Sequence, residues 1–271
     1  TNLGNGMLAG GLFANVKLNQ KIMELPSVKD IFIFPAMSDD GLSVGAALYT
    51  YYRMNGFEWK VKTLKSVYLG PSFTASDIKK SISSRGLKFK KCDARGIAKL
   101  LNKGEIILLF QGKMEFGPRA LGNRSVLSDP RDYELKEYLN RNLKKRDWFM
   151  PFAPTILKED TGKFIFALKK SELTSKFMTI TFDCKEVMKK NLRAVIHVDG
   201  TCRPQILEEK DNPRYYRIIK EFKKLTGIGM VLNTSFNLHG EPIVCTPDDA
   251  IDTFLRSGFK YLVLEDFLVE K

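Results

Sequence analysis

The chain has 271 residues, 44% of them hydrophobic and 28% charged, which suits one large or two ordinary domains and excludes a disordered polypeptide. It holds no run of about 18 apolar residues, so we expect no membrane-spanning helix. The net charge of +13 favours anionic ligands such as nucleotides, phosphates or nucleic acid. For most lysines, a basic surface that only aids solubility is an equal alternative.

The first residues and the cysteines indicate the context of the protein. The chain begins Thr1-Asn2-Leu3, without Met or a signal peptide, in a stretch that already resembles folded structure, so we expect a fragment whose upstream part is missing. Its four cysteines lie far apart and form no CxxC pair, which favours free thiols in a reducing cytoplasm over a zinc site. The longest cationic clusters, such as Lys144-Lys145-Arg146, are too short to form an extended tail.

The first quarter of the chain predicts a small folded segment followed by a linker. Residues 28–34 read as a strand, and a turn-rich loop carrying Asp39 follows. Residues 42–53 are small or apolar and predict a helix. We expect the domain boundary in a linker around residues 55–69.

From about residue 66 the pattern changes to alternating helices and strands. Capping residues and amphipathic spacing predict helices at 76–84, 93–103 and 214–225 and from Thr246 onward. Apolar runs predict strands at 87–91, 105–110, 177–182, 194–198, 228–232 and 260–264. This mixture indicates an α/β or α+β sheet domain.

The first candidate site lies within residues 110–131, directly after a buried strand. Glycines recur there at positions 112, 117 and 122, and cations at Lys113, Arg119 and Arg124. Glycines let backbone N–H groups approach an anion, and the cations can bind phosphate oxygens. The segment is not a Walker A loop, because Lys113 is followed by Met114. It therefore predicts phosphate handling by another architecture, and a solvated surface loop is the weaker alternative.

Two further segments carry polar residues beside predicted strands. Residues 233–237 (NTSFN) follow a buried strand, where small polar side chains can bind a ligand or can simply form a turn. Arg203 could hold an anion. For His197 and Asp199 we favour a hydrogen-bonded turn.

Two other patterns are weak. Residues 4–9 fit a relaxed dinucleotide fingerprint, G-x-G-x-x-A, but no strand precedes them. Asp39-Asp40 could ligate a metal, although paired acids in a loop are more often solvated.

Together these stretches resemble the carbamoyltransferase family of nodulation and antibiotic biosynthesis enzymes. The matching blocks occur in the family's order and span nearly the whole chain. They are residues 8–20, 35–48, 110–131, 150–160, 197–205 and 231–254.

The resemblance implies two parts. Residues 1–60 would be the tail of an actin-like ATPase-fold domain that transfers the carbamoyl group. Residues 65–271 would be a twisted sheet domain like that of threonylcarbamoyl-adenylate synthases. The second part would make carbamoyl-adenylate from carbamoyl phosphate and ATP, with Mg²⁺ on the ATP, and the first would pass the carbamoyl group to the hydroxyl of a small-molecule acceptor.

The resemblance also implies roles for individual residues. Lys113, Arg119, Ser235 and Asn237 match catalytic positions. Arg124, Arg203, Asn233 and Thr234 are expected around the nucleotide and the carbamoyl group. In the first part, Gly10, Gly11 and Asn15 match a nucleotide-binding loop and Asp39 matches a metal ligand. Residues 1–60 contain no histidine, so a metal site that also uses a His-x-x-x-His motif would be incomplete here.

The expected assembly is a cytoplasmic enzyme without a membrane partner, with a homodimer as one option and Fe²⁺ as an optional metal of the full-length protein. A nucleic-acid-binding module of the tRNA-modification type is the alternative suggested by the positive charge. It ranks lower because we find no aromatic RNA-binding stripe. A nucleotide-binding regulator without catalysis is weaker still.

Overall fold

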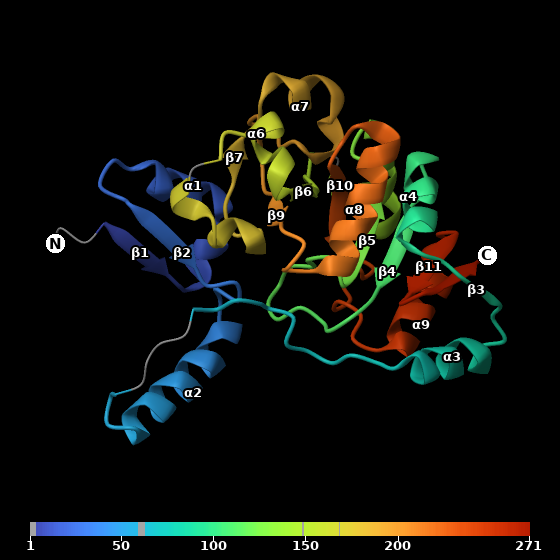
Figure 1. The fold of residues 1–271 in the computed structure, drawn as a ribbon, viewed down its shortest axis with the longest axis horizontal. Coiled ribbons are helices and arrows are strands. Elements are labelled where there is room, and N and C mark those ends of the chain that lie inside the picture. The colour runs from blue at the N-terminus through green and yellow to red at the C-terminus, as the bar shows by residue number, and fades with distance from the viewer. Residues whose placement is uncertain (1–3, 59–62, 148, 168) are drawn as a thin grey trace.

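The computed structural model describes residues 4–58, 63–147, 149–167 and 169–271, and within them the largest sheet has eight strands (Figure 1). Its spatial order is β3-β12-β11-β4-β5-β10-β6-β9. The strands are β3 (Phe89–Lys91), β4 (Ile107–Phe110), β5 (Arg124–Ser128), β6 (Ala153–Leu157), β9 (Gln205–Leu207), β10 (Met230–Ser235), β11 (Tyr261–Leu264) and β12 (Phe267–Glu270). Parallel and antiparallel pairs both occur, which confirms the predicted mixed α/β sheet.

Helices cover both faces of this sheet because its central strands are apolar on both sides. The side chains of Ile107 and Leu109 in β4 pack against α4 (Ala94–Asn102) and α8 (Pro213–Thr226). Those of Leu108 and Phe110 belong to the cluster that includes α3 (Ala75–Ser84) and α9 (Pro247–Ser257). Figure 1 shows these two helix pairs on opposite sides of the sheet.

Local sequence signals fix the ends of these helices. Thr246 and Asp249 form a reciprocal capping box at the start of α9, and Asp93 caps α4 through the N–H of Gly96. Gly227 ends α8 in the left-handed conformation, as its sequence position predicted.

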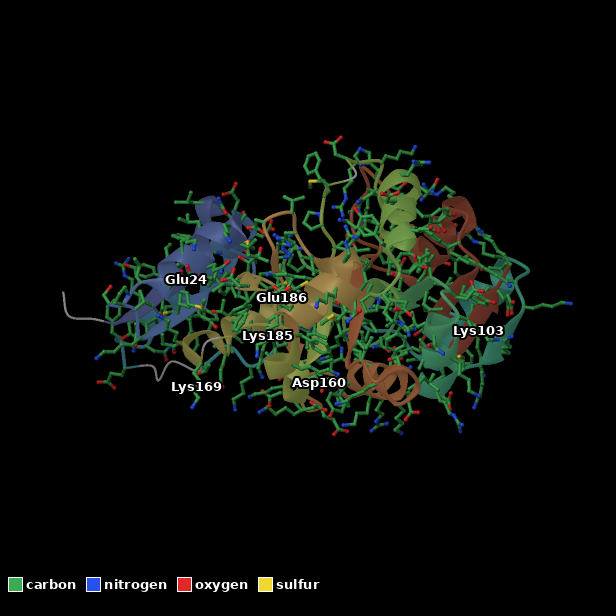
Figure 2. All side chains as sticks on the ribbon, turned by 90° about the horizontal axis from the view of Figure 1, so that it is seen from above. Glu24, Lys103, Asp160, Lys169, Lys185 and Glu186 are labelled. Atoms are coloured by element: carbon green, nitrogen blue, oxygen red, sulfur yellow. The ribbon has the colours of Figure 1, made fainter. Side chains whose placement is uncertain are left out.

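We call the part formed by β1 (Asn5–Leu8), α1 (Val16–Glu24), β2 (Asp30–Ile33) and α2 (Asp40–Met54) the N-terminal lobe. β1 and β2 form a separate two-stranded parallel sheet. The lobe packs on the segment around Thr174: the hydroxyl of Thr174 donates to the carbonyl of Ile31, and the side-chain amide of Asn19 donates to the carbonyl of Thr179. Figure 2 shows the molecule from above, with Glu24 of this lobe and Lys103 beyond α4 toward opposite ends.

The remaining helices and strands are short. They are α5 (Tyr133–Tyr138), α6 (Thr161–Phe164), β7 (Phe182–Asp183), α7 (Glu186–Asn191) and β8 (Thr201–Cys202). β7 and β8 pair with each other. Among the described residues, no helix is both long and apolar enough to cross a membrane.

Several sequence predictions need correction. Residues 177–182 are mostly not a strand: a 3₁₀ turn occupies Thr174–Phe177, and strand structure begins only at Phe182. Residues 194–198 are not a strand either, because Arg193–Val195 forms a 3₁₀ turn. Residues 4–9 are themselves mostly strand β1, so they do not form a glycine-rich loop after a strand.

The predicted division at residues 60 and 65 falls partly on residues 59–62, outside the described part of the chain. The prediction about residues 1–3 as an interrupted start also lies outside it.

Candidate functional site

A cleft of about 300 Å³ lies at the end of β10, between the loop after Gly117 and the segment after α5. Cationic and small polar side chains dominate its wall. It is lined by Pro118, Arg119, Ala120, Lys144, Arg146, Pro151, Phe152, Ala153, Met178, Arg203, Asn233, Thr234, Ser235, Asn237, His239 and Gly240. We call it the cationic cleft, because its wall includes four Lys or Arg residues and, among the described residues, no Asp or Glu.

Arg119 is followed directly by a stretch of loop, residues 120–124, whose backbone is held by hydrogen bonds. The side chain of Asn233 binds the carbonyl of Ala120, and the hydroxyl of Tyr68 binds the carbonyl of Leu121. The N–H of Gly122 donates to the hydroxyl of Ser125 at 2.9 Å. Such a loop holds its cation in place before a ligand arrives.

Glu115 is the anchor of this loop. One carboxylate oxygen accepts the N–H groups of Leu121 at 2.7 Å, Asn123 at 2.7 Å and Arg124 at 3.2 Å. Only 7% of Glu115 is exposed, and burial raises the pKa of its carboxyl group while these N–H donors oppose that shift.

Two glycines of this loop occupy left-handed backbone that favours glycine. Gly122 has φ 105°, and a Cβ there would lie 2.1 Å from a ring carbon of Tyr215. Gly117 has φ 108°, and a Cβ there would lie 3.3 Å from the carbonyl oxygen of Pro35 in the N-terminal lobe. The glycines therefore serve close packing of the loop, in addition to any approach to an anion.

Lys144 and Arg146 are the functional candidates that the sequence reasoning missed. They follow a π-helical turn, Leu139–Leu143, that continues α5, and such turns are frequent at functional sites. Lys145 between them has φ 41°, so the chain turns sharply while both neighbours reach the cleft. The sequence indicated only that this cluster is too short to form an extended tail.

The ammonium group of Lys144 is bound at the end of β10. Its Nζ donates to the Oδ1 of Asn237 at 2.6 Å and lies 3.0 Å from the Oγ of Ser235. It also contacts the carbonyl oxygens of Ser235 and Asn237, at 2.8 and 3.1 Å. Burial and the neighbouring Arg146 lower the pKa of Lys144 to about 7.

The polar residues of β10 lie on the strand, although the sequence predicted a strand that ends at residue 232. Asn233, Thr234 and Ser235 pair with Leu127, Val126 and Ser125 of β5. The Oγ of Ser235 donates to the Oδ1 of Asn237 at 2.6 Å, so both predicted catalytic residues share one network with Lys144.

The guanidinium groups of the cleft have no carboxylate partner among the residues that line it. Burial and the nearby Arg119 and Arg146 lower the pKa of Arg203 to about 9. The Nε atoms of Arg119 and Arg203 are buried and have no hydrogen-bond partner within the described chain. Four clustered cations repel one another, so a bound anion would stabilise this arrangement.

Lys113 and Arg124 are not brought into the cleft. The side chain of Lys113 is exposed and is absent from the cleft wall. Arg124 is fully buried, and its guanidinium donates to the carbonyl oxygens of Gln111 and Asn123 at 2.9 and 3.0 Å and lies 3.6 Å from the ring centre of Phe110. Its visible role is to hold the loop, and its expected contact with a nucleotide has no support in this geometry.

The expected turn at His197 and Asp199 is confirmed. The Oδ1 of Asp199 accepts hydrogen bonds from the N–H and the hydroxyl of Thr201, at 3.1 and 2.7 Å. Asp199 also pairs with Lys17 of α1 at 3.0 Å. This turn therefore helps to join β8 to the N-terminal lobe, and Arg203 follows it.

The predicted nucleotide loop and metal ligand of the N-terminal lobe lie near each other. The N–H of Gly10 donates to the carbonyl of Met37 at 2.6 Å, two residues before Asp39. The Oδ1 of Asn15 caps α1 through Lys17 and Leu18, so its oxygen serves the helix. Asp39 is exposed, and the described residues contain no group of three metal-binding side chains. Within the described part of the chain, Asp39 is therefore not grouped with two further metal-binding side chains.

A larger groove of about 730 Å³ lies between α4 and α8. Its Arg214 is already paired with Glu265 at 3.2 Å and Asp266 at 2.9 Å. We place the functional site in the cationic cleft, because its cations lack such partners there.

Two parts of one known family match most of the chain. The family described as carbamoyltransferase C-terminus matches residues 98–271, and the one described as carbamoyltransferase N-terminus matches residues 1–48.

Individual relatives give the same result. An uncharacterized protein, MJ1058, of Methanocaldococcus jannaschii is 42% identical, covering 97% of this chain and 44% of that protein. Nodulation protein NolO of Bradyrhizobium diazoefficiens is 40% identical, covering 97% of this chain and 49% of that protein. Nodulation protein U of Sinorhizobium fredii is 31% identical, covering 87% and 40%. The chain thus spans about half the length of the curated relatives it matches.

Among solved structures, the crystal structure of T. kodakarensis HypF aligns with a TM-score of 0.41 and 21% identity. The alignment covers 56% of this chain and 18% of that one.

Proposed function

This chain belongs to the carbamoyltransferase family, and on that premise we propose that its cationic cleft binds carbamoyl phosphate and ATP and forms carbamoyl-adenylate. The observation that carries the proposal is the cluster of Arg119, Lys144, Arg146 and Arg203 without an acidic residue among the described residues of the wall. Two polyanions must meet in this reaction, so fixed positive charge is the main requirement of the site.

The residues divide the work by their chemistry. The planar guanidinium groups of Arg119 and Arg203 suit phosphate oxygens, and their unpartnered Nε atoms can donate to them. Lys144 adds a compact charge, which the side-chain oxygens of Ser235 and Asn237 hold in place. Positioning and charge stabilisation would supply most of the rate, with little acid–base chemistry.

Water would cleave carbamoyl phosphate to carbamate and phosphate, and an oxygen of the carbamate would then attack the α-phosphorus of ATP and displace pyrophosphate. One carbamoyl phosphate, one ATP and one water thus give carbamoyl-adenylate, phosphate and pyrophosphate. Mg²⁺ would enter on the ATP phosphates, since the described residues of the cleft wall offer no carboxylate for it. We further propose that the full-length protein transfers the carbamoyl group to an acceptor hydroxyl through the part that includes the N-terminal lobe.

Pyrophosphate release from ATP tests the proposal. The 271-residue chain, supplied with Mg-ATP, should release pyrophosphate only when carbamoyl phosphate is present, and Arg203→Met should reduce the rate at least about tenfold, since it removes a donor to the developing charge. Pyrophosphate release at the same rate with and without carbamoyl phosphate, and in the parent and Arg203→Met, would contradict the proposal.

Equilibrium binding gives a second reading that does not require turnover. Calorimetric titration of the same chain with carbamoyl phosphate should show binding that Arg203→Met weakens. A folded chain that binds neither carbamoyl phosphate nor ATP would overturn the assignment of the cleft.

A further inference from the structure

The side-chain amide of Asn233 lies in the wall of the cationic cleft, and only its NH₂ group has hydrogen-bond partners among the described residues. Asn233 is 1% exposed. Its Nδ2 donates to the carbonyl oxygen of Ala120 at 3.1 Å and to the Oγ1 of Thr155 at 3.2 Å. Its Oδ1 is buried and has no hydrogen-bond partner among the described residues.

The neighbours of Asn233 fix which end of the amide faces which way. The carbonyl of Ala120 is an acceptor only, so it must meet the NH₂ end. The hydroxyl of Thr155 donates its hydrogen to the Oε1 of Gln205 at 3.0 Å. Gln205 is itself oriented, because its Nε2 donates to the carbonyl of Leu121 at 3.0 Å. Thr155 must therefore accept from Asn233, and a flipped amide would break both contacts.

The buried Oδ1 of Asn233 differs from the charged groups of the cleft wall, because it is an acceptor without a donor among the described residues. Burying a carbonyl oxygen without a donor is destabilising, so a ligand donor at this atom would be favourable. The charged side chains of the wall are all donors: Arg119, Lys144, Arg146 and Arg203. They suit the phosphate end of a ligand, whereas the Oδ1 of Asn233 suits a ligand N–H.

We infer that the Oδ1 of Asn233 accepts a hydrogen bond from the amino group of the carbamoyl donor and thereby distinguishes carbamoyl from acyl groups without N–H. The inference rests on the proposed function, and it adds the residue that selects the acyl group. Acetyl phosphate carries the same phosphate but a methyl group in place of the NH₂. It would leave the oxygen unpaired, and sites built to pair a substrate N–H discriminate strongly against analogues that lack it.

The test compares the affinities of carbamoyl phosphate and acetyl phosphate for each form of the full 271-residue chain by calorimetry. The parent chain should bind carbamoyl phosphate about tenfold or more tightly than acetyl phosphate. Asn233→Leu should reduce that ratio to about one. Asn233→Asp, which keeps an oxygen in this place, should keep the preference although both ligands bind more weakly.

Thr155→Val serves as the matched control, because it removes a partner of the Nδ2 and leaves the Oδ1 unchanged, so the ratio should persist. If Asn233→Leu does not fold, Asn233→Ala is measured in its place. A parent ratio near one, or a preference that survives both apolar substitutions, overturns the inference while carbamoyl phosphate binding still supports the proposed function. A folded parent that binds neither phosphate overturns both.

Discussion

The Nζ of Lys144 lies 2.6 Å from the Oδ1 of Asn237, a residue 93 positions later in the chain. This contact joins the segment after α5, which carries Lys144 and Arg146, to Ser235 and Asn237 at the end of β10. It also buries the ammonium group, since only 7% of Lys144 is exposed. Burial and Arg146 lower the pKa of Lys144 to about 7, so its charge changes near neutral pH.

Anion binding should therefore weaken as the pH rises through about 7. Sulfate is a suitable probe, because its own charge is constant between about pH 6 and 9. We expect several-fold tighter sulfate binding at pH 6 than at pH 8.5, since protonated Lys144 attracts the anion and the neutral amine does not. Titration calorimetry at a series of pH values measures this.

The other charged or titratable groups of the cleft wall are Arg119, Arg146, Arg203 and His239. Lys144→Gln should flatten the pH dependence, whereas His239→Gln, the matched control, should leave it in place. A dependence that disappears with His239 and survives in Lys144→Gln would remove Lys144 as its source.

Lys113 and Arg119 make a direct comparison between the sequence prediction and the geometry. Both were predicted to be catalytic, yet only Arg119 lines the cleft, and the side chain of Lys113 is exposed. We expect Arg119→Ala to weaken carbamoyl phosphate binding at least about tenfold, because a charge-assisted pair to phosphate contributes about 1.5–3 kcal/mol. Lys113→Ala should change it less than about threefold. Comparable losses in the two variants would show that Lys113 reaches the ligand.

The sequence predicted elements well where the pattern was apolar and periodic. The apolar run at 105–110 and the capped helices beginning after Asp93 and at Pro247 are present, because burial and capping act locally. The strand predicted at residues 194–198 was wrong, because a short apolar run has the same pattern in a strand and in a buried turn.

The site was only partly predictable for a related reason. Arg119, Ser235 and Asn237 stood next to glycines or strand ends, which are recognisable local signals. Lys144 and Arg146 stood in a polar run that resembles an exposed surface. Their burial depends on contacts with Asn237 and Phe152, which no local pattern encodes. The role of Arg124 in holding the loop depends equally on the fold, since its guanidinium binds backbone carbonyl oxygens and stacks on the ring of Phe110.

Glu115 should control both the stability of the chain and the position of Arg119. One of its oxygens accepts three backbone N–H groups, from Leu121, Asn123 and Arg124. Glu115→Leu would leave these donors buried and unpaired, so we expect it to lower the free energy of unfolding by about 3 kcal/mol or more. Glu115→Gln keeps an acceptor oxygen and should cost about 1 kcal/mol. Urea unfolding measures both values.

The pH dependence of the free energy of unfolding shows how ionisation of the Glu115 carboxyl group affects stability. Burial raises the pKa of Glu115 in the folded chain above its ordinary value of 4.5. The Glu115 carboxyl group therefore holds its proton more tightly in the folded chain than in the unfolded chain. The free energy of unfolding of the parent should exceed that of Glu115→Gln most at a pH below 4.5. The advantage of the parent over Glu115→Gln should shrink as the pH rises through the raised pKa. An advantage that grows with pH would mean that the three N–H donors outweigh burial, and that Glu115 holds the loop as a fully ionised anchor.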